Sequence, residues 1–280
     1  MKLPFQERGT LQNFSFLNLY GTDQNGYVLR LTTLRSVKNS DISSDKSPEE
    51  IIWVDEYTVS DPEEKLDSAV CRSRSKIWEL AMCNDWEYFF TVTLDPKKYD
   101  RFDLDKFHED FTTFLYEYKH RKYKIQFLII PERHESGAWH FHGLMFGLPL
   151  DELQLFKIGD QMSKRLVRLV RSGRELYSWP AVSDRFGYNT FEPINNYQAV
   201  CKYVTKYIKK DIAKSVTEVG AHTYFRSRGL NERKKIFKGF LTSDITLPVI
   251  NSYKDNYATV LDFELNQENL TEILSKLHKK

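Results

Sequence analysis

Hydrophobic and polar residues follow two spacings along the chain, and each spacing predicts its own kind of element. Residues 86–94 (WEYFFTVTL) are rich in aromatic, Thr and Val residues and predict a core strand. The large apolar residues of 104–118 recur at helical spacing, which predicts an amphipathic helix over a sheet. This reading extends to strands within 1–38 and at 124–130, 176–179 and 188–194, and to helices at 65–84, 151–170 and 197–214. Such irregular alternation is typical of an α+β fold with an antiparallel sheet and helices on one face.

The stretch 129–146 (IIPERHESGAWHFHGLMF) predicts a β-hairpin. Two apolar runs flank the polar turn 135–137, where Gly137 can take the left-handed position of a three-residue loop. Such a loop pairs residue 134 with 138, 132 with 140 and 130 with 142. Pro131 is irregular for an inner strand and indicates a bulge or a sheet edge.

Two histidines in this hairpin suggest a metal site. Because side chains alternate along a strand, His140 and His142 share one face while Phe141 points into the core. The three-residue loop places Glu132 opposite His140, where it can serve as a third ligand. A two-residue loop would place Arg133 there instead, and His134 is the substitute ligand. The alternative reading makes both histidines hydrogen-bonded structural residues.

Composition limits the class of protein. The chain has 280 residues, of which 41% are hydrophobic, enough for one large domain or a domain with appendages. It contains no apolar run of membrane-spanning length and no N-terminal signal peptide, so no membrane partner is expected. Three scattered cysteines (Cys71, Cys83 and Cys201) argue against a disulfide framework and against a cysteine zinc site, and suit the cytoplasm.

Charge is distributed unevenly along the chain, although the net charge is only +2. Residues 39–68 hold ten acidic and two basic residues, a net of −8, and predict a surface linker or loop. Residues 197–240 hold eleven basic and three acidic residues, a net of +8. The basic segment indicates a face that binds a polyanion, and its alternative is a solvated helix surface.

The helix predicted from residue 197 carries a second group of reactive side chains. Asn195 and Asn196 are expected to cap it. Tyr203 and Tyr207 lie one turn apart, and Lys206 and Lys210 follow them at the same spacing of three residues. A tyrosine hydroxyl can act as a nucleophile, and a nearby lysine favours phenolate and binds phosphate. The alternative is that both tyrosines are packing residues.

These motifs resemble those of the HUH endonucleases, specifically the rolling-circle replication initiators (Rep proteins) of small bacteriophages and plasmids. Residues 89–94 (FFTVTL) are similar to the first motif, a structural strand, and 139–143 (WHFHG) match the HUH metal motif. Residues 203–207 (YVTKY) match the tyrosine motif in its two-tyrosine form, and 224–230 (YFRSRGL) are similar to a segment downstream of it. The order, with the histidines before the tyrosines, is that of replication initiators and transposases.

The resemblance covers about residues 71–240 and implies a ferredoxin-like (RRM-like) HUH domain with a central antiparallel sheet and flanking helices. It implies Mg²⁺ or Mn²⁺ as the metal. Residues 1–70 are then an N-terminal element with an acidic linker, residues 71–240 the nuclease domain, and residues 241–280 a C-terminal tail of no assigned role.

The expected activity is the nicking and rejoining of single-stranded or hairpin origin DNA through a 5′-phosphotyrosine link and a free 3′-hydroxyl. Tyr203 and Tyr207 are the expected nucleophiles with Lys206 beside them, and the expected DNA contacts are Lys202, Lys209, Lys210, Arg226, Arg228 and Lys234. The chain has no G-x-x-x-x-G-K-[ST] motif, so unwinding is expected from a host helicase and the replication machinery, in the cytoplasm of a bacterial host.

Three other functions fit parts of the sequence. A zinc hydrolase for small molecules would use the histidines and Glu132, but it leaves the basic segment unexplained. A non-catalytic nucleic-acid-binding module would stack bases on Phe89 or Tyr88, but it leaves the histidine pair unexplained. A transposase of the IS200 type shares the chemistry, but its catalytic domain is usually shorter and has one tyrosine.

Overall fold

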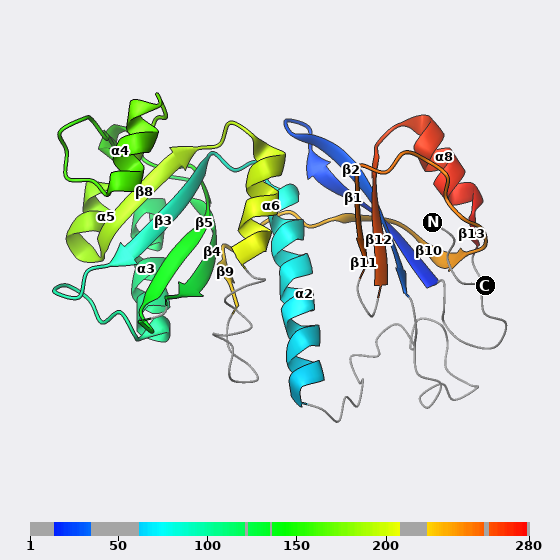
Figure 1. Cartoon of the computed structure of the whole chain (residues 1–280), viewed down its shortest axis with the longest axis horizontal. Coiled ribbons are helices and arrows are strands. Elements are labelled where there is room, and N and C mark those ends of the chain that lie inside the picture. Colours follow the sequence, from blue (N-terminus) through cyan, green and yellow to red (C-terminus); the bar gives the residue numbers. More distant parts are fainter. Residues whose placement is uncertain are drawn as a thin grey trace. The chain divides into compact units, whose positions relative to one another are not determined.

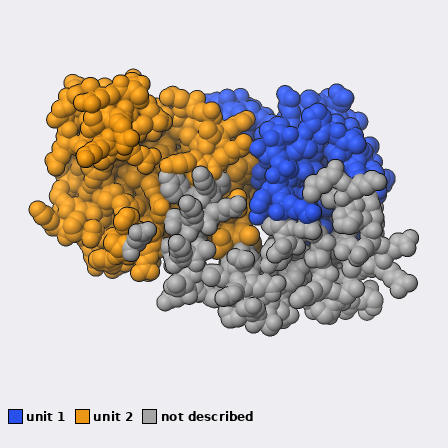
Figure 2. Space-filling model, viewed as in Figure 1, with its two compact units in different colours: residues 1–60, 232–280 blue, residues 61–231 orange. Residues whose placement is uncertain are grey.

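The computed structural model describes residues 14–34, 62–120, 123–134, 136–207, 223–254 and 258–278 (Figure 1). It divides the chain into two compact units, shown in two colours in Figure 2: unit 1 comprises residues 1–60 and 232–280, and unit 2 comprises residues 61–231. The N-terminal element and the segment after residue 240, expected to be separate parts, therefore belong to one unit.

Unit 1 is built on a six-stranded antiparallel sheet in the order β11-β12-β2-β1-β10-β13. Its strands are β1 (Phe14–Thr22), β2 (Gly26–Leu34), β10 (Lys234–Leu241), β11 (Asn251–Lys254), β12 (Ala258–Glu264) and β13 (Leu277–His278), and its helix is α8 (Gln267–Ser275). Apolar residues from both ends of the chain, among them Leu29, Phe263 and Ile273, form its core. Arg30 donates two hydrogen bonds, of 2.6 and 2.8 Å, to Asp262 on the neighbouring strand. Unit 1 is thus closed by contacts between segments from opposite ends of the chain.

Unit 2 contains a seven-stranded antiparallel sheet in the order β6-β7-β8-β3-β5-β4-β9. Its strands are β3 (Tyr88–Leu94), β4 (Gln126–Arg133), β5 (Trp139–Phe146), β6 (Gln154–Leu155), β7 (Tyr177–Ser178), β8 (Gly187–Pro193) and β9 (Phe225–Arg226). Its helices are α2 (Pro62–Met82), α3 (Leu104–His120), α4 (Lys164–Arg171), α5 (Pro180–Arg185) and α6 (Tyr197–Tyr207). The four central strands lie in the order β8-β3-β5-β4, with α3 after the first in the chain and α4 and α5 before the last. This arrangement confirms the expected α+β, ferredoxin-like architecture.

Alternation along β3 separates the two faces of this sheet. Phe90 and Val92 are fully buried and pack with Phe107 and Phe111 of α3, which lies behind the sheet in Figure 1. The residues between them, which include Thr91, face the other way. One face therefore holds an aromatic core and the other is free to carry polar side chains.

The opposite face is partly covered by a second pair of helices, α2 and α6, which run side by side (Figure 1). The Tyr197 hydroxyl at the start of α6 donates to the carbonyl oxygen of Ala81 in α2 at 2.5 Å. The expectation that all helices lie on one face was therefore wrong. The buried residues of both helices, such as Ile77 and Val204, need an apolar partner, and the two helices supply it to each other and to the sheet.

The helix expected at 151–170 was also wrong, because a turn interrupts it. Leu150–Glu152 form one 3₁₀ turn, β6 follows, and α4 begins only at Lys164. Gly159 has a φ of +110°, and the backbone N–H of Lys157 donates to the Asp160 carboxylate at 2.6 Å. This local turn competes with helix formation, and Ser163 then caps α4 by accepting from the N–H of Leu166.

The other expected elements of unit 2 are found within a few residues of their predicted ends. The helix expected at 197–214 is α6 as far as Tyr207, and its remainder lies outside the described residues. Among the described helices, none has both the length and the apolar composition needed to cross a membrane.

Close packing around β5 leads to a prediction for stability. A Cβ at position 143 would meet the Leu128 carbonyl oxygen of β4 and would lie 2.6 Å from the Phe90 ring. We expect Gly143→Ala to reduce the free energy of unfolding by about 3 kcal/mol in urea titrations, because neither backbone nor core ring can yield. Gly173→Ala is the control: its Cβ meets no atom within 4 Å, and only the positive φ of +83° opposes it, at about 1 kcal/mol. Equal losses in both variants would contradict the packing argument.

Candidate functional site

The polar face of the unit 2 sheet carries a row of reactive side chains across four strands. Thr93 of β3 pairs with Tyr188 of β8 on one side and with His140 of β5 on the other, and His140 pairs with Glu132 of β4. The next row on this face holds Thr190, Thr91, His142 and Ile130. The two expected metal-binding histidines therefore share a face.

The hairpin that positions them has the register expected from the sequence. The N–H of His134 donates to Ala138 O and the N–H of Gly137 donates to His134 O, both at 2.8 Å, and Gly137 has a φ of +83°. Glu132 consequently lies opposite His140, as predicted. Pro131 marks a sheet edge, because β9 pairs with β4 only at Leu128 and Ile129 and leaves Pro131 with β5 alone.

Threonines of β3 hold the inner nitrogen of each histidine ring. Thr91 Oγ1 lies 3.0 Å from His142 Nδ1, and Thr93 Oγ1 lies 3.1 Å from His140 Nδ1. A hydrogen bond of 2.6 Å joins His142 Nε2 to Glu132 Oε2. Both rings are thus oriented from behind, with Nε2 as the outer nitrogen, which is the usual arrangement behind metal-binding histidines.

The donor types suit a divalent cation, but the side chains are not gathered around one. Within the described residues, no three His, Cys, Asp or Glu side chains form a group that could hold a metal ion as they stand. Glu132 and His142 contact each other directly, and the His140 ring instead lies 5.4 Å from that of His134. Binding a metal would require Nδ1–H of His142 to donate to Thr91, so that Nε2 is free to ligate.

Electrostatics keep the His140 ring neutral. Burial lowers the pKa of His140 below its usual 6.5, the positive charges of His134 and His142 lower it further, and the Glu132 carboxylate opposes the shift. A neutral imidazole retains the lone pair that a metal ligand needs.

Tyr203 stands one aromatic ring away from the histidines. Asn196 caps α6 by accepting from the N–H of Ala199 at 3.0 Å, and Val204 is buried, which turns Tyr203 outward with 37% of its surface exposed. Its ring meets that of Phe89 edge-on at 5.4 Å, and Phe89 stacks on His142 at 6.0 Å with 12° between the planes. The structure therefore brings the first expected tyrosine and the histidine pair to the same sheet face.

The other expected catalytic residues are described less fully. Tyr207 and Lys206 belong to α6, but their side chains lie outside the described part of the structure. Lys209 and Lys210 lie outside the described residues altogether. Their roles stay predictions.

The expected DNA-binding residues fall into two groups. Lys202 is exposed beside Tyr203 on α6, and Arg226 and Arg228 are exposed on and just after β9, which pairs with β4. Lys234 is also exposed but is the first residue of β10, in unit 1. The predicted set is therefore divided between the two units.

Sequence reasoning missed four residues of this face: Thr91, Thr93, Phe89 as the ring between tyrosine and histidine, and Tyr188. The alternation of Phe90 and Val92 with the threonines was a readable signal that they face away from the core. Tyr188, 40% exposed, alternates in the same way with the buried Asn189.

The charges around His140 predict how it titrates. In metal-free protein kept in EDTA, we expect NMR to give a His140 midpoint below 6.5, raised by His134→Ala and lowered by Glu132→Gln. Because unfolded His140 binds a proton more readily than folded His140, its contribution favours folding above pH 6.5 and is lost as the pH falls below that value. Shifts of the same sign in both variants would contradict this account.

Comparisons with known proteins give one match. Residues 87–212, less than half of the chain, match the family model of the replication-associated proteins of the ORF2 type. Searches of curated proteins and of solved structures find no match. The matched segment runs from β3 through α6 and includes both histidines, Glu132 and Tyr203. The similarity supports a replication initiator of the Rep type.

Proposed function

We propose that this chain is an HUH-type endonuclease that nicks and rejoins single-stranded origin DNA during rolling-circle replication. The observation that carries the proposal is the contact series Tyr203–Phe89–His142, which brings a candidate nucleophile and a candidate phosphate-activating site together. The match of residues 87–212 to a replication-associated family supports the same function.

The proposed reaction is a transesterification at one phosphate. The Tyr203 hydroxyl oxygen bonds to phosphorus, and the bond from phosphorus to the 3′ oxygen breaks. The phenol proton is lost to solvent, and the departing oxygen takes up a proton to become a free 3′-hydroxyl. One phosphodiester replaces another, so the energy of the bond is kept in the 5′-phosphotyrosine link and the reverse reaction can rejoin the strand.

His140, His142 and Glu132 are the residues that would hold a divalent cation, Mg²⁺ or Mn²⁺. When bound, such a cation would polarise a phosphate oxygen and offset its charge. The threonine hydroxyls behind the two rings would fix their orientation, which supports ligand geometry in metal sites generally.

A second tyrosine gives a way to end replication. Tyr207 lies one helical turn after Tyr203 in α6, with Lys206 between them. One tyrosine would open the origin and the other would accept the strand after one round. Lys206 and Lys210 would bias the phenols toward phenolate.

Basic residues around the site would bind the DNA backbone. Lys202, Arg226 and Arg228 are exposed in unit 2, and Lys209, Lys210 and Lys234 complete the proposed set. Lysine and arginine contacts to single strands make binding depend on salt, because each releases counterions. Host helicase and replication proteins in a bacterial cytoplasm would supply unwinding and synthesis.

The tyrosines are tested by the covalent adduct. After incubation with single-stranded origin DNA and Mn²⁺, we expect an adduct band on denaturing gels from Tyr203→Phe and from Tyr207→Phe, but none from the double variant. Tyr188→Phe is the matched control, since Tyr188 is similarly exposed on the same sheet face. Adduct formation by the double variant, or its loss in Tyr188→Phe, would place the nucleophile elsewhere.

The metal ligands are tested by the rate of adduct formation. We expect EDTA to abolish it and His142→Ala or Glu132→Gln to reduce it about 10- to 100-fold or more, because each removes a ligand. His134→Ala should leave the rate unchanged. If His134→Ala is impaired and Glu132→Gln is not, His134 is the third ligand; EDTA-resistant cleavage would refute a metal requirement.

A further inference from the structure

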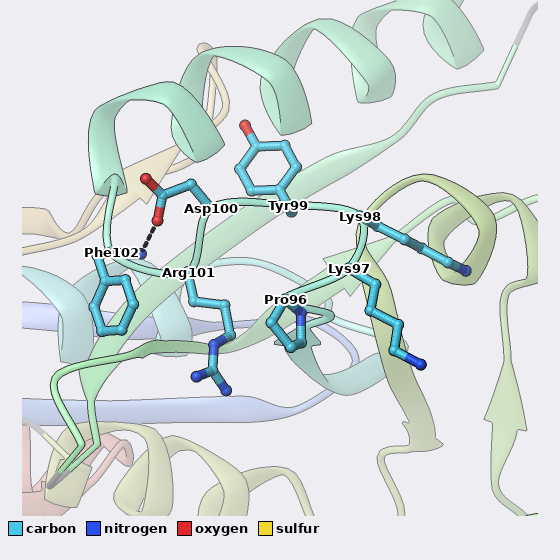
Figure 3. A pocket seen from close by; sticks show the side chains of 7 residues that line it. All are labelled: Pro96, Lys97, Lys98, Tyr99, Asp100, Arg101 and Phe102. Atoms are coloured by element: carbon cyan, nitrogen blue, oxygen red, sulfur yellow. Dashed lines mark hydrogen bonds between the residues drawn. The ribbon is translucent and has the colours of Figure 1, made fainter.

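A hollow opens at the end of the unit 2 sheet, in the connection from β3 to α3. Residues 96–102 line it: Pro96, Lys97, Lys98, Tyr99, Asp100, Arg101 and Phe102 (Figure 3). Its volume is about 490 Å³, within the range of sites that bind small molecules or single nucleotides. None of these residues belongs to the site described above.

The lining of the hollow is basic. Three cationic side chains and one carboxylate give it a net charge of +2. The carboxylate of Asp100 accepts from the N–H of Phe102 at 2.9 Å, the bond drawn in Figure 3, and Asp95 accepts from the N–H of Lys97. Because the acidic groups hold the loop backbone, the cationic groups can meet an anionic ligand.

Hydrogen bonds fasten this loop to the hairpin that carries the histidines. The N–H of Trp139 donates to Arg101 O at 2.9 Å, and Trp139 Nε1 donates to Phe102 O at 3.2 Å. Trp139 directly precedes His140. At its other end, the N–H of Asp95 donates to Phe186 O just before β8. The loop therefore spans the end of the sheet nearest the row of Thr93 and His140.

Two side chains of the loop lack the surroundings that would explain them as structural residues. Arg101 Nε is buried, with no hydrogen-bond partner among the described residues. Phe102 leaves 57% of its surface exposed, the largest exposure among the aromatic side chains described. Figure 3 shows Arg101 and Phe102 pointing away from α3, whereas Tyr99 points toward it and bonds to Asp110. The charge of Arg101 also acts on His140, which shows that the two are near each other.

We propose that this loop binds one nucleotide of single-stranded DNA next to the phosphate that is cut. The Arg101 guanidinium contacts the phosphate of that nucleotide, and the Phe102 ring stacks on its base. Aromatic stacking combined with cationic contacts is the usual means of holding single strands. This inference rests on the proposed nuclease function, since it names a contact to the same substrate.

Binding of a fluorescent oligo(dT) of 20 nucleotides, followed by anisotropy, tests the subsite. Loss of one stacked base in Phe102→Ala should weaken binding about 5- to 150-fold, and Phe102→Trp should restore it. Ile158→Ala is the control, because Ile158 is 65% exposed on the turn before α4. For Arg101→Ala, the slope of log affinity against log salt should fall by about 0.7, as one phosphate contact is lost.

Arg171→Ala removes the same charge from exposed α4 and should leave the slope unchanged. Equal effects of Arg101→Ala and Arg171→Ala would overturn the proposal, because they would reflect net charge alone. Unchanged oligo(dT) binding in Phe102→Ala would also overturn it, and would leave a small phosphorylated ligand as the occupant to test.

The covalent adduct separates this proposal from the function it rests on. If wild-type protein forms the adduct and the loop variants bind as wild type does, the subsite is refuted and the nuclease stands. If no adduct forms under any condition but the loop variants lose binding, the nuclease is refuted and the loop is a DNA-binding site of another activity.

Discussion

The register of three paired strands is the constraint on which the candidate site depends. Side chains alternate along a strand, so a shift of β5 by one residue would turn both histidines into the core and Phe141 out to solvent. Phe141 is fully buried and its ring stacks on that of Phe107 at 3.7 Å. The aromatic core on one face therefore fixes the position of the polar groups on the other.

The same register explains how the site is supported from behind. β3 lies next to β5, and its Thr91 and Thr93 are paired with His142 and His140. Each hydroxyl meets the ring nitrogen of its partner, so two hydrogen bonds set the orientation of both rings. Because strands of a sheet are rigid compared with loops, ligands placed there need little reorganisation when a metal or a phosphate binds.

The helices and the β3–α3 loop give this face its surroundings. α6 covers part of it and presents Tyr203 to Phe89, while the rest stays open. The loop at the end of the sheet adds positive charge and an exposed ring beside the histidine row. A strand of DNA that crosses the face would meet a nucleophile at one side and a cationic hollow at the end, which fits cutting at a defined phosphate.

The local sequence alone determined the hairpin, its three-residue loop, the shared face of His140 and His142, and the cap of α6. Each depends on residues close together in the chain, where alternation, a glycine and a capping side chain act directly. The turn at Gly159 was also local, and the apolar spacing on either side of it concealed the break.

Only the tertiary structure decided that β3 pairs with β5, that Phe89 joins Tyr203 to His142, and that Arg101 lies near His140. It also decided that strands from both ends of the chain form one sheet. Such contacts depend on which strands become neighbours, and that choice is made by the burial of the whole core, which no single segment of sequence contains.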